Sequence, residues 1–410
     1  MNFNADRPFS ITGFDQELRE NILPFWMSHP LDKHRGGFHG ALSSSNEVLI
    51  GVERGSILCS RILWTFSKAF HHYREQPLLE VAQWAYRDLL HRFWDDQYGG
   101  VYWSTDDHGQ PLQDRKHTYA QAFAIYGLTA FFEISDDRHA LELSKNLFHL
   151  IDTHTFDDKN GGNLECRSRE WTPLEDMRLS DKDLNSSKSM NTLLHLTEAY
   201  SALVRVWKDA RLTNRLEGLI DLFQKRIIDL QSGHQLLFFT DQWESLSNHI
   251  SYGHDIETSW LLLEAASALG DEKWIRKAEN ACVTMAQTVY DEALLEDGSI
   301  LYEASPDGFK DLTKQWWAHA EAVVGFYNAY QQTGQPLFLD ASKKVWGYIQ
   351  DHFIDREGGD WFKALDSNGY PDLTHNKVGP WDCPYHHARM CLEMIHRSEK
   401  TKRFQMPGQA

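Results

Sequence analysis

The sequence predicts an all-α protein, a closed (α/α)6 barrel of twelve helices in six hairpins, with short β pieces in its loops. Two observations lead to this prediction: turn-like Asp/Gly segments recur six times along the chain, and helical periodicity fills the stretches between them. The turns centre on Gly36, Gly99, Gly161, Gly233, Gly298 and Gly358. Their spacing of roughly 60–70 residues exceeds that of TPR or ankyrin repeats and fits one helical hairpin with long connections.

The expected helices follow these turns in order along the chain. The helix expected at 187–207 shows the pattern well, because Leu196, Ala199, Tyr200 and Leu203 form an apolar stripe of period 3.6. The twelve helices are expected at 14–29, 54–73, 76–93, 116–135, 137–153, 187–207, 210–230, 254–268, 271–290, 313–333, 336–353 and 383–399. Short β-like pieces are expected beside the turns, at 99–103 and 236–243.

No Pro- or Ser-rich linker interrupts this series, so residues 1–410 are expected to form a single domain. An open α-solenoid is the alternative, but six units without an obvious polar capping repeat favour closure. In a closed helical barrel, long loops and inner-helix ends meet at one concave end, where pockets form. Polar residues on otherwise apolar helix faces are therefore the candidates for a functional site.

Composition excludes several classes of protein. With 41 Lys and Arg against 59 Asp and Glu, the net charge of −18 lacks the basic excess that a nucleic-acid partner requires. Five widely spaced cysteines without a CxxC pair argue against a disulfide framework or a zinc ribbon. Neither a signal peptide nor an apolar run of about 18 residues is visible, so a cytoplasmic protein without a membrane span is expected. The 13% aromatic residues suit either a large core or a site for sugar rings.

Two polar groups lie on apolar helices in the first half of the chain. Arg61 stands within the apolar segment SRILWTFSKAF, where it could form a structural ion pair or point a cation at an oxygen in the cavity. Asn191, His195 and Glu198 are spaced by four and three residues, so they share one face of one helix. Three polar groups in a row exceed what a single buried histidine needs.

Two further groups stand where helices are expected to begin. His254 and Glu257 follow Gly253 and fall in a first helical turn. Pro384 suits the first position of the next such helix, which places His386 in its opening turn. A helix N-terminus disfavours a charged imidazole, so both histidines are expected to stay neutral and to be usable as bases. The adjacent His387 points elsewhere and is expected to support His386 or lie at the surface.

Three chemistries compete for these residues. A zinc or manganese site contributed by separate helices is one alternative, although no HExxH occurs. A glycosidase needs two carboxylates, for which Glu303, Asp255 and Glu257 are candidates, but it leaves the histidines without a role. Three histidines and an arginine fit proton abstraction next to a carbonyl better, with the arginine holding the developing enediolate oxygen.

Five stretches in the same order resemble the cellobiose 2-epimerases of the N-acylglucosamine 2-epimerase superfamily: SRILWTFSKAF, KSMNTLLHLTEAY, GHDIETSWLL, QWWAHAEAVVGF and GPWDCPYHHARMCLEM. The resemblance covers nearly the whole chain. It implies an (α/α)6 barrel that opens a sugar ring, removes the C2 proton to form a cis-enediolate, and returns a proton to the opposite face. It implies neither a metal nor another cofactor, and a small sugar as the partner.

The resemblance also implies roles for individual residues. His254 and His386 would be the acid/base pair, with His195 as a third histidine that stabilises the intermediate or opens the ring. Arg61 would bind substrate oxygens. The remaining implied sugar contacts are Tyr119, Asn191, Glu257, Glu303, Trp317 and Trp381.

Asp382 and His387 depart from the pattern that this resemblance implies. Cellobiose 2-epimerases usually read WKCPYHN where this chain reads WDCPYHH, and relatives that act on monosaccharides carry PDxYHA. A mannose 2-epimerase is therefore the close alternative, and an aldose–ketose isomerase would use the same enediolate. Independently of this departure, a glycoside hydrolase or lyase on the same barrel and a non-catalytic glycan-binding protein remain as alternatives. The long loop that contains Trp243 is expected to cover the pocket or to contact a second subunit of a homodimer.

Overall fold

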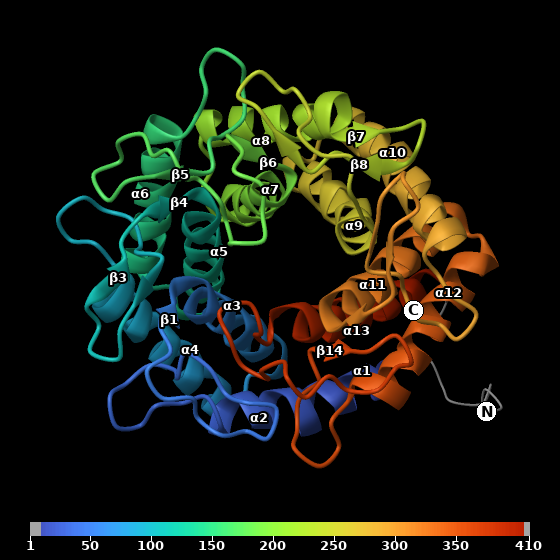
Figure 1. Cartoon of the computed structure of the whole chain (residues 1–410), viewed down its shortest axis with the longest axis horizontal. Helices are drawn as coiled ribbons and strands as arrows, with labels where there is room; N and C mark the ends of the chain where they lie inside the picture. The colour runs from blue at the N-terminus through green and yellow to red at the C-terminus, as the bar shows by residue number, and fades with distance from the viewer. Residues whose placement is uncertain (1–9, 406–410) are drawn as a thin grey trace, which may run out of the picture.

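The computed structural model describes residues 10–405, which form two concentric layers of helices (Figure 1). The inner helices are α3 (Ser56–Tyr73), α5 (Thr118–Ser135), α7 (Met190–Val206), α9 (Tyr252–Leu269), α11 (Trp316–Thr333) and α13 (Tyr385–Gln405). Each packs against the next, and α13 returns to contact α3. The ring is therefore closed, which confirms the predicted (α/α)6 barrel against the open solenoid.

The outer layer alternates with the inner one. Its helices are α1 (Ile11–Gln16), α2 (Leu23–Ser28), α4 (Gln76–Asp88), α6 (Arg138–His154), α8 (Ala210–Leu222), α10 (Glu272–Glu292) and α12 (Pro336–Tyr348). Four π-helical turns were not predicted: η1 (Glu17–Ile22) joins α1 to α2, and η2 (Leu89–Phe93), η3 (Phe223–Ile227) and η4 (Ile349–Phe353) end α4, α8 and α12. Elsewhere the expected helix bounds agree within a few residues. The single domain over 1–410 stays a prediction.

The repeated turns share one hydrogen-bond pattern. In five of them an Asp carbonyl accepts from the backbone N–H of a glycine four residues later, as Asp32 does from Gly36 and Asp95 from Gly99. The glycine has a positive φ, for example 79° at Gly36, a conformation that a side chain disfavours. In the last turn this glycine is Gly359 rather than the expected Gly358.

Short antiparallel strands lead into the inner helices and fix where these helices begin. The sheets are β1 (Arg54–Gly55) with β2 (Ser104–Thr105) and β3 (Pro111–Gln113), and β10 (Ile250–Ser251) with β11 (Glu303–Ala304) and β12 (Lys310–Asp311). Two-stranded pairs join β4 (Lys116–His117) to β5 (Cys166–Arg167), β6 (Lys188–Ser189) to β9 (Phe238–Phe239), β7 (Ile228–Asp229) to β8 (His234–Gln235), and β13 (Lys314–Gln315) to β14 (Ala364–Leu365). Because β1, β4, β6, β10 and β13 each run directly into an inner helix, all these helix N-termini gather at one end of the barrel.

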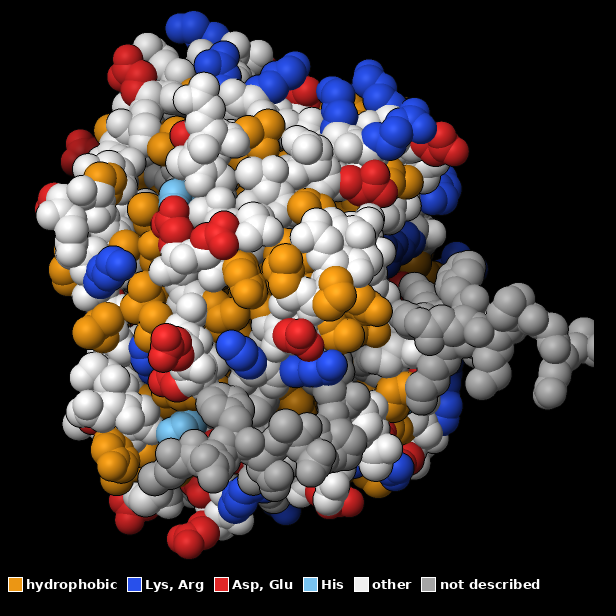
Figure 2. All heavy atoms as spheres, turned by 90° about the vertical axis from the view of Figure 1, so that its right-hand side faces the viewer, with side chains coloured by type: hydrophobic (Ala, Val, Ile, Leu, Met, Phe, Trp, Pro, Cys, Tyr) orange, Lys and Arg blue, Asp and Glu red, His pale blue; other side chains and the backbone are white. Residues whose placement is uncertain are grey.

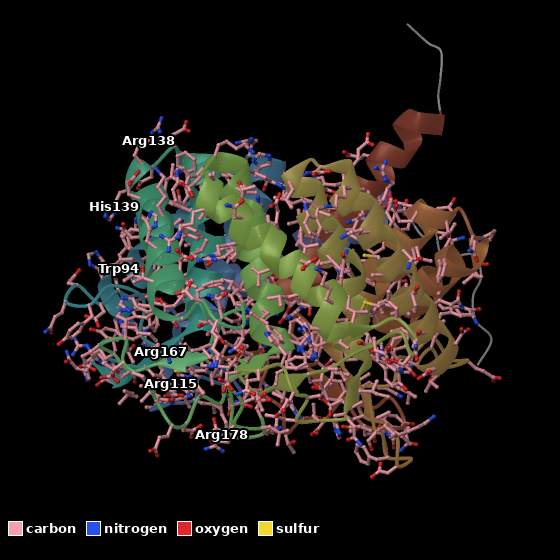
Figure 3. The ribbon with its side chains drawn as sticks, turned by 90° about the horizontal axis from the view of Figure 1, so that it is seen from above. Trp94, Arg115, Arg138, His139, Arg167 and Arg178 are labelled. Atoms are coloured by element: carbon pink, nitrogen blue, oxygen red, sulfur yellow. The ribbon has the colours of Figure 1, made fainter. Side chains whose placement is uncertain are left out.

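The two ends of the barrel differ. In the side view, the loops that carry Arg115, Arg167 and Arg178 lie at one end, whereas Arg138 and His139 begin α6 at the other (Figure 3). Acidic and basic side chains are interspersed on the outer face that Figure 2 displays. Among the described residues, no helix has the length and apolar character needed to span a membrane.

Candidate active site

A cavity of about 1550 Å³ opens at the end of the barrel where the inner helices begin. All ten residues that the sequence predicted for the site line it: Arg61, Tyr119, Asn191, His195, His254, Glu257, Glu303, Trp317, Trp381 and His386. The fold brings them together because most of them occupy the first two turns of successive inner helices. Sequence spacing alone could not show this convergence.

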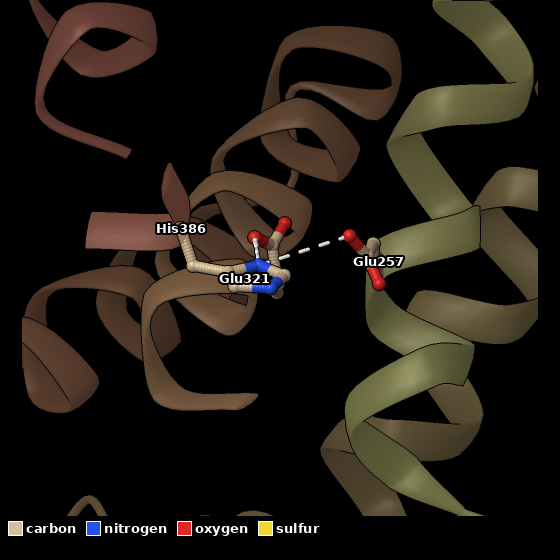
Figure 4. A group of neighbouring side chains, drawn as sticks. All are labelled: Glu257, Glu321 and His386. Carbon is tan, nitrogen blue, oxygen red and sulfur yellow. Dashed lines mark hydrogen bonds and ion pairs between the residues drawn. The ribbon is translucent and has the colours of Figure 1, made fainter. Parts of the chain in front are cut away.

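His386 is buried and held by a carboxylate. Its Nδ1 lies 2.7 Å from Oε1 of Glu321 (Figure 4), and its ring packs against Trp316 and Trp317. Burial, together with the nearby Arg61 and other cations, holds the pKa of His386 well below its ordinary value. A carboxylate acceptor at Nδ1 fixes the proton there, so the unprotonated Nε2 is available as a base.

His254 has a different support. Its Nδ1 lies 2.8 Å from the Ser251 hydroxyl, and its ring packs 4.8 Å from that of Trp317. Gly253 permits this approach, since a Cβ there would come within 2.6 Å of the Trp317 ring. Burial lowers the pKa of His254 to about 3, so the imidazole is neutral near pH 7. The neutral state expected from the sequence is confirmed, with burial as its main cause.

His195 forms a third supported histidine. Its Nδ1 lies 3.1 Å from Oε2 of Glu198, one turn further along α7. Burial lowers its pKa to about 4, although the Glu198 carboxylate acts in the opposite direction. The rings of Tyr119 and Phe123 pack against it at 5.1 and 4.8 Å.

A buried arginine that the sequence analysis did not single out joins the supporting carboxylates. The Arg389 guanidinium lies 2.6 Å from Glu257 and 2.7 Å from Glu321, and also contacts Glu198. Burial raises the pKa of Glu198, but Arg389 and His195 outweigh it and lower that pKa to about 2. Burial raises the pKa values of Glu257 and Glu321. The sequence did offer a signal for both residues. Arg389 lies one turn after His386, and Glu321 lies one turn after Trp317.

The same cluster holds the residues that a metal site would use. Among the described residues, Glu257, Glu321 and His386 offer ligand atoms within 4.8 Å of one another. The Arg389 guanidinium already contacts both carboxylates and supplies the positive charge that they need. Arg389 therefore supplies, at these ligand atoms, the positive charge that a metal ion would otherwise supply.

Of the two alternatives predicted for Arg61, the structure excludes the structural ion pair. Arg61 is only 3% exposed, and within the described chain its guanidinium contacts the Tyr119 hydroxyl and the Cys383 sulfur but no carboxylate. Its guanidinium donates to the Tyr119 hydroxyl at 2.8 Å and lies 4.2 Å from the centre of the Phe123 ring, and its Nε has no partner. A buried, uncompensated cation at the cavity wall is suited to an oxygen that develops negative charge.

The other residues predicted to contact the sugar differ in their interactions with the rest of the protein. The buried Oδ1 of Asn191 has no hydrogen-bond partner in the described structure. Glu303 lies half-buried on β11, 3.6 Å from His249. Trp381 packs edge-on against Tyr119, with ring centres 5.7 Å apart. Trp317 contacts the rings of both His254 and His386, with ring centres 4.8 and 5.6 Å apart.

The surface alternative for His387 and the helix start at Pro384 were wrong, whereas the loop that contains Trp243 lines part of the cavity, in agreement with one of its two predicted alternatives. His387 is fully buried rather than at the surface, because its Nε2 binds Asp360 at 2.6 Å. Pro384 precedes α13, which begins at Tyr385. Trp243 does not line the cavity: its indole N–H donates to the Asn160 carbonyl and its ring packs against Gly162. Ser247 and His249 are the members of that loop that reach the cavity.

Comparison with known proteins gives consistent results. The family model for N-acylglucosamine 2-epimerase matches residues 36–390. The cellobiose 2-epimerase of Bacteroides fragilis is 42% identical over 381 residues, which cover 93% of this chain and 97% of that protein. The cellobiose 2-epimerase structure from Bacillus thermoamylovorans B4167 superposes with a TM-score of 0.90 at 39% identity, covering 94% and 99% of the two chains. A D-mannose isomerase structure shares the fold, with a TM-score of 0.83 at 22% identity and coverage of 96% and 100%.

Proposed function

Because the chain belongs to the N-acylglucosamine 2-epimerase family and is an epimerase, we propose that it interconverts the glucose and mannose configurations at C2 of a reducing sugar. The substrate class is a cellobiose-type disaccharide or free mannose and glucose. The observation that carries this proposal is the convergence of three neutral, buried histidines and the uncompensated Arg61 on one cavity.

In the proposed reaction the sugar first opens to its aldehyde form, which makes the C2 proton acidic. Nε2 of His386 removes this proton from one epimer, and the C–H electron pair forms the C1=C2 bond of an enediolate. Negative charge moves to O1, where Arg61 stabilises it. His254 takes up a proton from solvent in the sugar complex and, as an imidazolium, delivers it to the opposite face of C2, while His386 later returns its proton to solvent. The reverse reaction exchanges the roles of the two histidines.

The remaining residues support these steps. His195 is assigned to ring opening or to a hydrogen bond with the enediolate, because its support by Glu198 leaves Nε2 available. Trp317 and Trp381 offer flat surfaces for the C–H faces of the sugar. Tyr119, Asn191, Glu257 and Glu303 are assigned to sugar hydroxyls or, for Glu257, to the supporting ion cluster.

Cavity size bears on the length of the substrate. About 1550 Å³ is larger than the roughly 300–1,000 Å³ that holds most small ligands, so a second sugar ring fits beside the first. The loop segments 177–184 and 309–313 line the outer part of the cavity. This supports a disaccharide substrate, whereas Asp382 in place of the usual lysine favours a monosaccharide-restricted 2-epimerase as the second candidate.

One incubation series tests the reaction class. Mannose, glucose and cellobiose are each incubated with the protein in D2O, and products are separated by chromatography. We expect the 2-epimer of at least one sugar, with deuterium at C2. A ketose as the main product would indicate an aldose–ketose isomerase, and glucose released from cellobiose a hydrolase. Saturable sugar binding without any product would leave a glycan-binding protein.

A further inference from the structure

The cavity wall contains a carboxylate that neither the fold nor the proposed reaction uses, that of Asp382. It lies next to Trp381 in the loop before α13, four residues before His386, and it lines the same cavity as the histidines. The chain makes room for it at Gly379, where a Cβ would come within 2.7 Å of Oδ2. The Gly379 N–H donates to the Asp382 carbonyl at 3.1 Å, which holds this turn in place.

The other sheltered carboxylates around the cavity are all engaged. Glu165 accepts from Ser189 and Thr192, Glu257 contacts Arg389, and Glu303 contacts His249. Asp183, Asp311 and Asp372 accept from neighbouring hydroxyls. Among the described acids that line the cavity and are not exposed, Asp382 alone has neither a hydrogen bond nor an ion pair.

Asp382 is partly exposed and lines the cavity, so a bound sugar can reach its carboxylate. Burial raises the pKa of Asp382 to about 6 and Asp360 adds to this, although Lys363, His375 and Arg61 act in the opposite direction. A ligand that displaces water from this carboxylate must replace the hydrogen bonds that the water made. A sugar presents several hydroxyl donors at the cavity wall, and one of them would supply the missing bond.

We propose that Asp382 is a substrate-binding residue whose carboxylate accepts a hydrogen bond from a hydroxyl group of the bound sugar. This inference rests on the proposed function, because it takes the reducing sugar as the ligand of the cavity. Asp382 acts on binding and not on proton transfer at C2. The bond is formed in the ground state and the transition state alike, so its loss raises KM and leaves kcat nearly unchanged.

The test compares the D382N and D382E variants with the native protein on mannose and cellobiose. D382N should raise KM about 10-fold or more, as a hydrogen bond to a charged group is worth roughly that factor. Its kcat and its isotope effect with C2-deuterated substrate should stay within about threefold of the native values. Its thermal midpoint should be unchanged or higher, since no internal bond is lost. D382E should regain part of the affinity, and D158N, at an exposed turn, serves as the matched control.

Three outcomes would overturn the inference. They are an unchanged KM in D382N, a fall in kcat equal to the rise in KM, and a lowered thermal midpoint that D382E does not restore. If the native protein catalyses no C2 exchange, the proposed function fails, but the inference is still tested. Calorimetric titration with cellobiose and mannose would then compare the dissociation constants of the native protein and D382N.

Discussion

Replacing Glu321 with glutamine tests how His386 is prepared as a base. Glu321 accepts from His386 Nδ1 at 2.7 Å and also binds Arg389 and Trp260. The glutamine amide keeps the size of the side chain but removes the charge, and its NH2 group cannot face Arg389 and His386 favourably. The imidazole then loses the charge-assisted bond that holds its tautomer and orientation.

The expected magnitude follows from that bond. Supporting partners of this kind are worth about 10–100-fold, so kcat/KM of E321Q should fall by that factor, equivalent to about 1.4–2.7 kcal/mol. Initial rates of epimer formation, measured across substrate concentration, give the value. The isotope effect with C2-deuterated sugar should rise, because proton removal becomes more rate-limiting. E142Q, an exposed position paired with Lys145, is the control and should match the native protein. Native kcat/KM in E321Q would refute the role assigned to Glu321.

Three further predictions concern the same cavity. H254A and H386A should each lower kcat by about 10²–10⁴-fold in the same assay, and near-native turnover in both would contradict the acid/base assignment. R389M leaves three buried carboxylates without their cation and should lower the free energy of unfolding by about 3–5 kcal/mol, measured by denaturant titration; an unchanged midpoint would show that the cluster is not stabilising. Since the folded pKa of His254 is depressed to about 3 and that of His386 also lies low, both stay in the base form as pH falls through 6.5. The decline of kcat/KM toward acid pH should therefore have its midpoint below pH 6. A midpoint at pH 6.5 or above would contradict the burial of the two histidines.

The sequence predicted the ring of helices because the apolar stripes and the Asp/Gly turns are local signals. The residues of the cavity were also predictable, since Arg61, His195, His254 and His386 are polar groups on apolar helices. The network behind them was harder to predict. Arg389 and Glu321 belong to different helices, and only the closed ring places the guanidinium between carboxylates of α7, α9 and α11.

The π-helical turns were not predictable from hydrophobic periodicity, because a one-residue widening at the end of a helix leaves the apolar stripe nearly intact. The burial of His387 was missed for a related reason. Its direction away from His386 follows from helix geometry, but whether that direction meets solvent or Asp360 depends on a loop that comes from the preceding hairpin.

The central claim is that protons leave and reach C2 on opposite faces, through His386 and His254. The most direct measurement is the early distribution of deuterium when mannose or cellobiose reacts in D2O, followed by NMR at less than about a tenth of conversion. Two histidines on opposite faces predict one deuterium at C2 of nearly every product molecule, while the remaining substrate stays unlabelled. A product that retains the original hydrogen at C2 would contradict the claim.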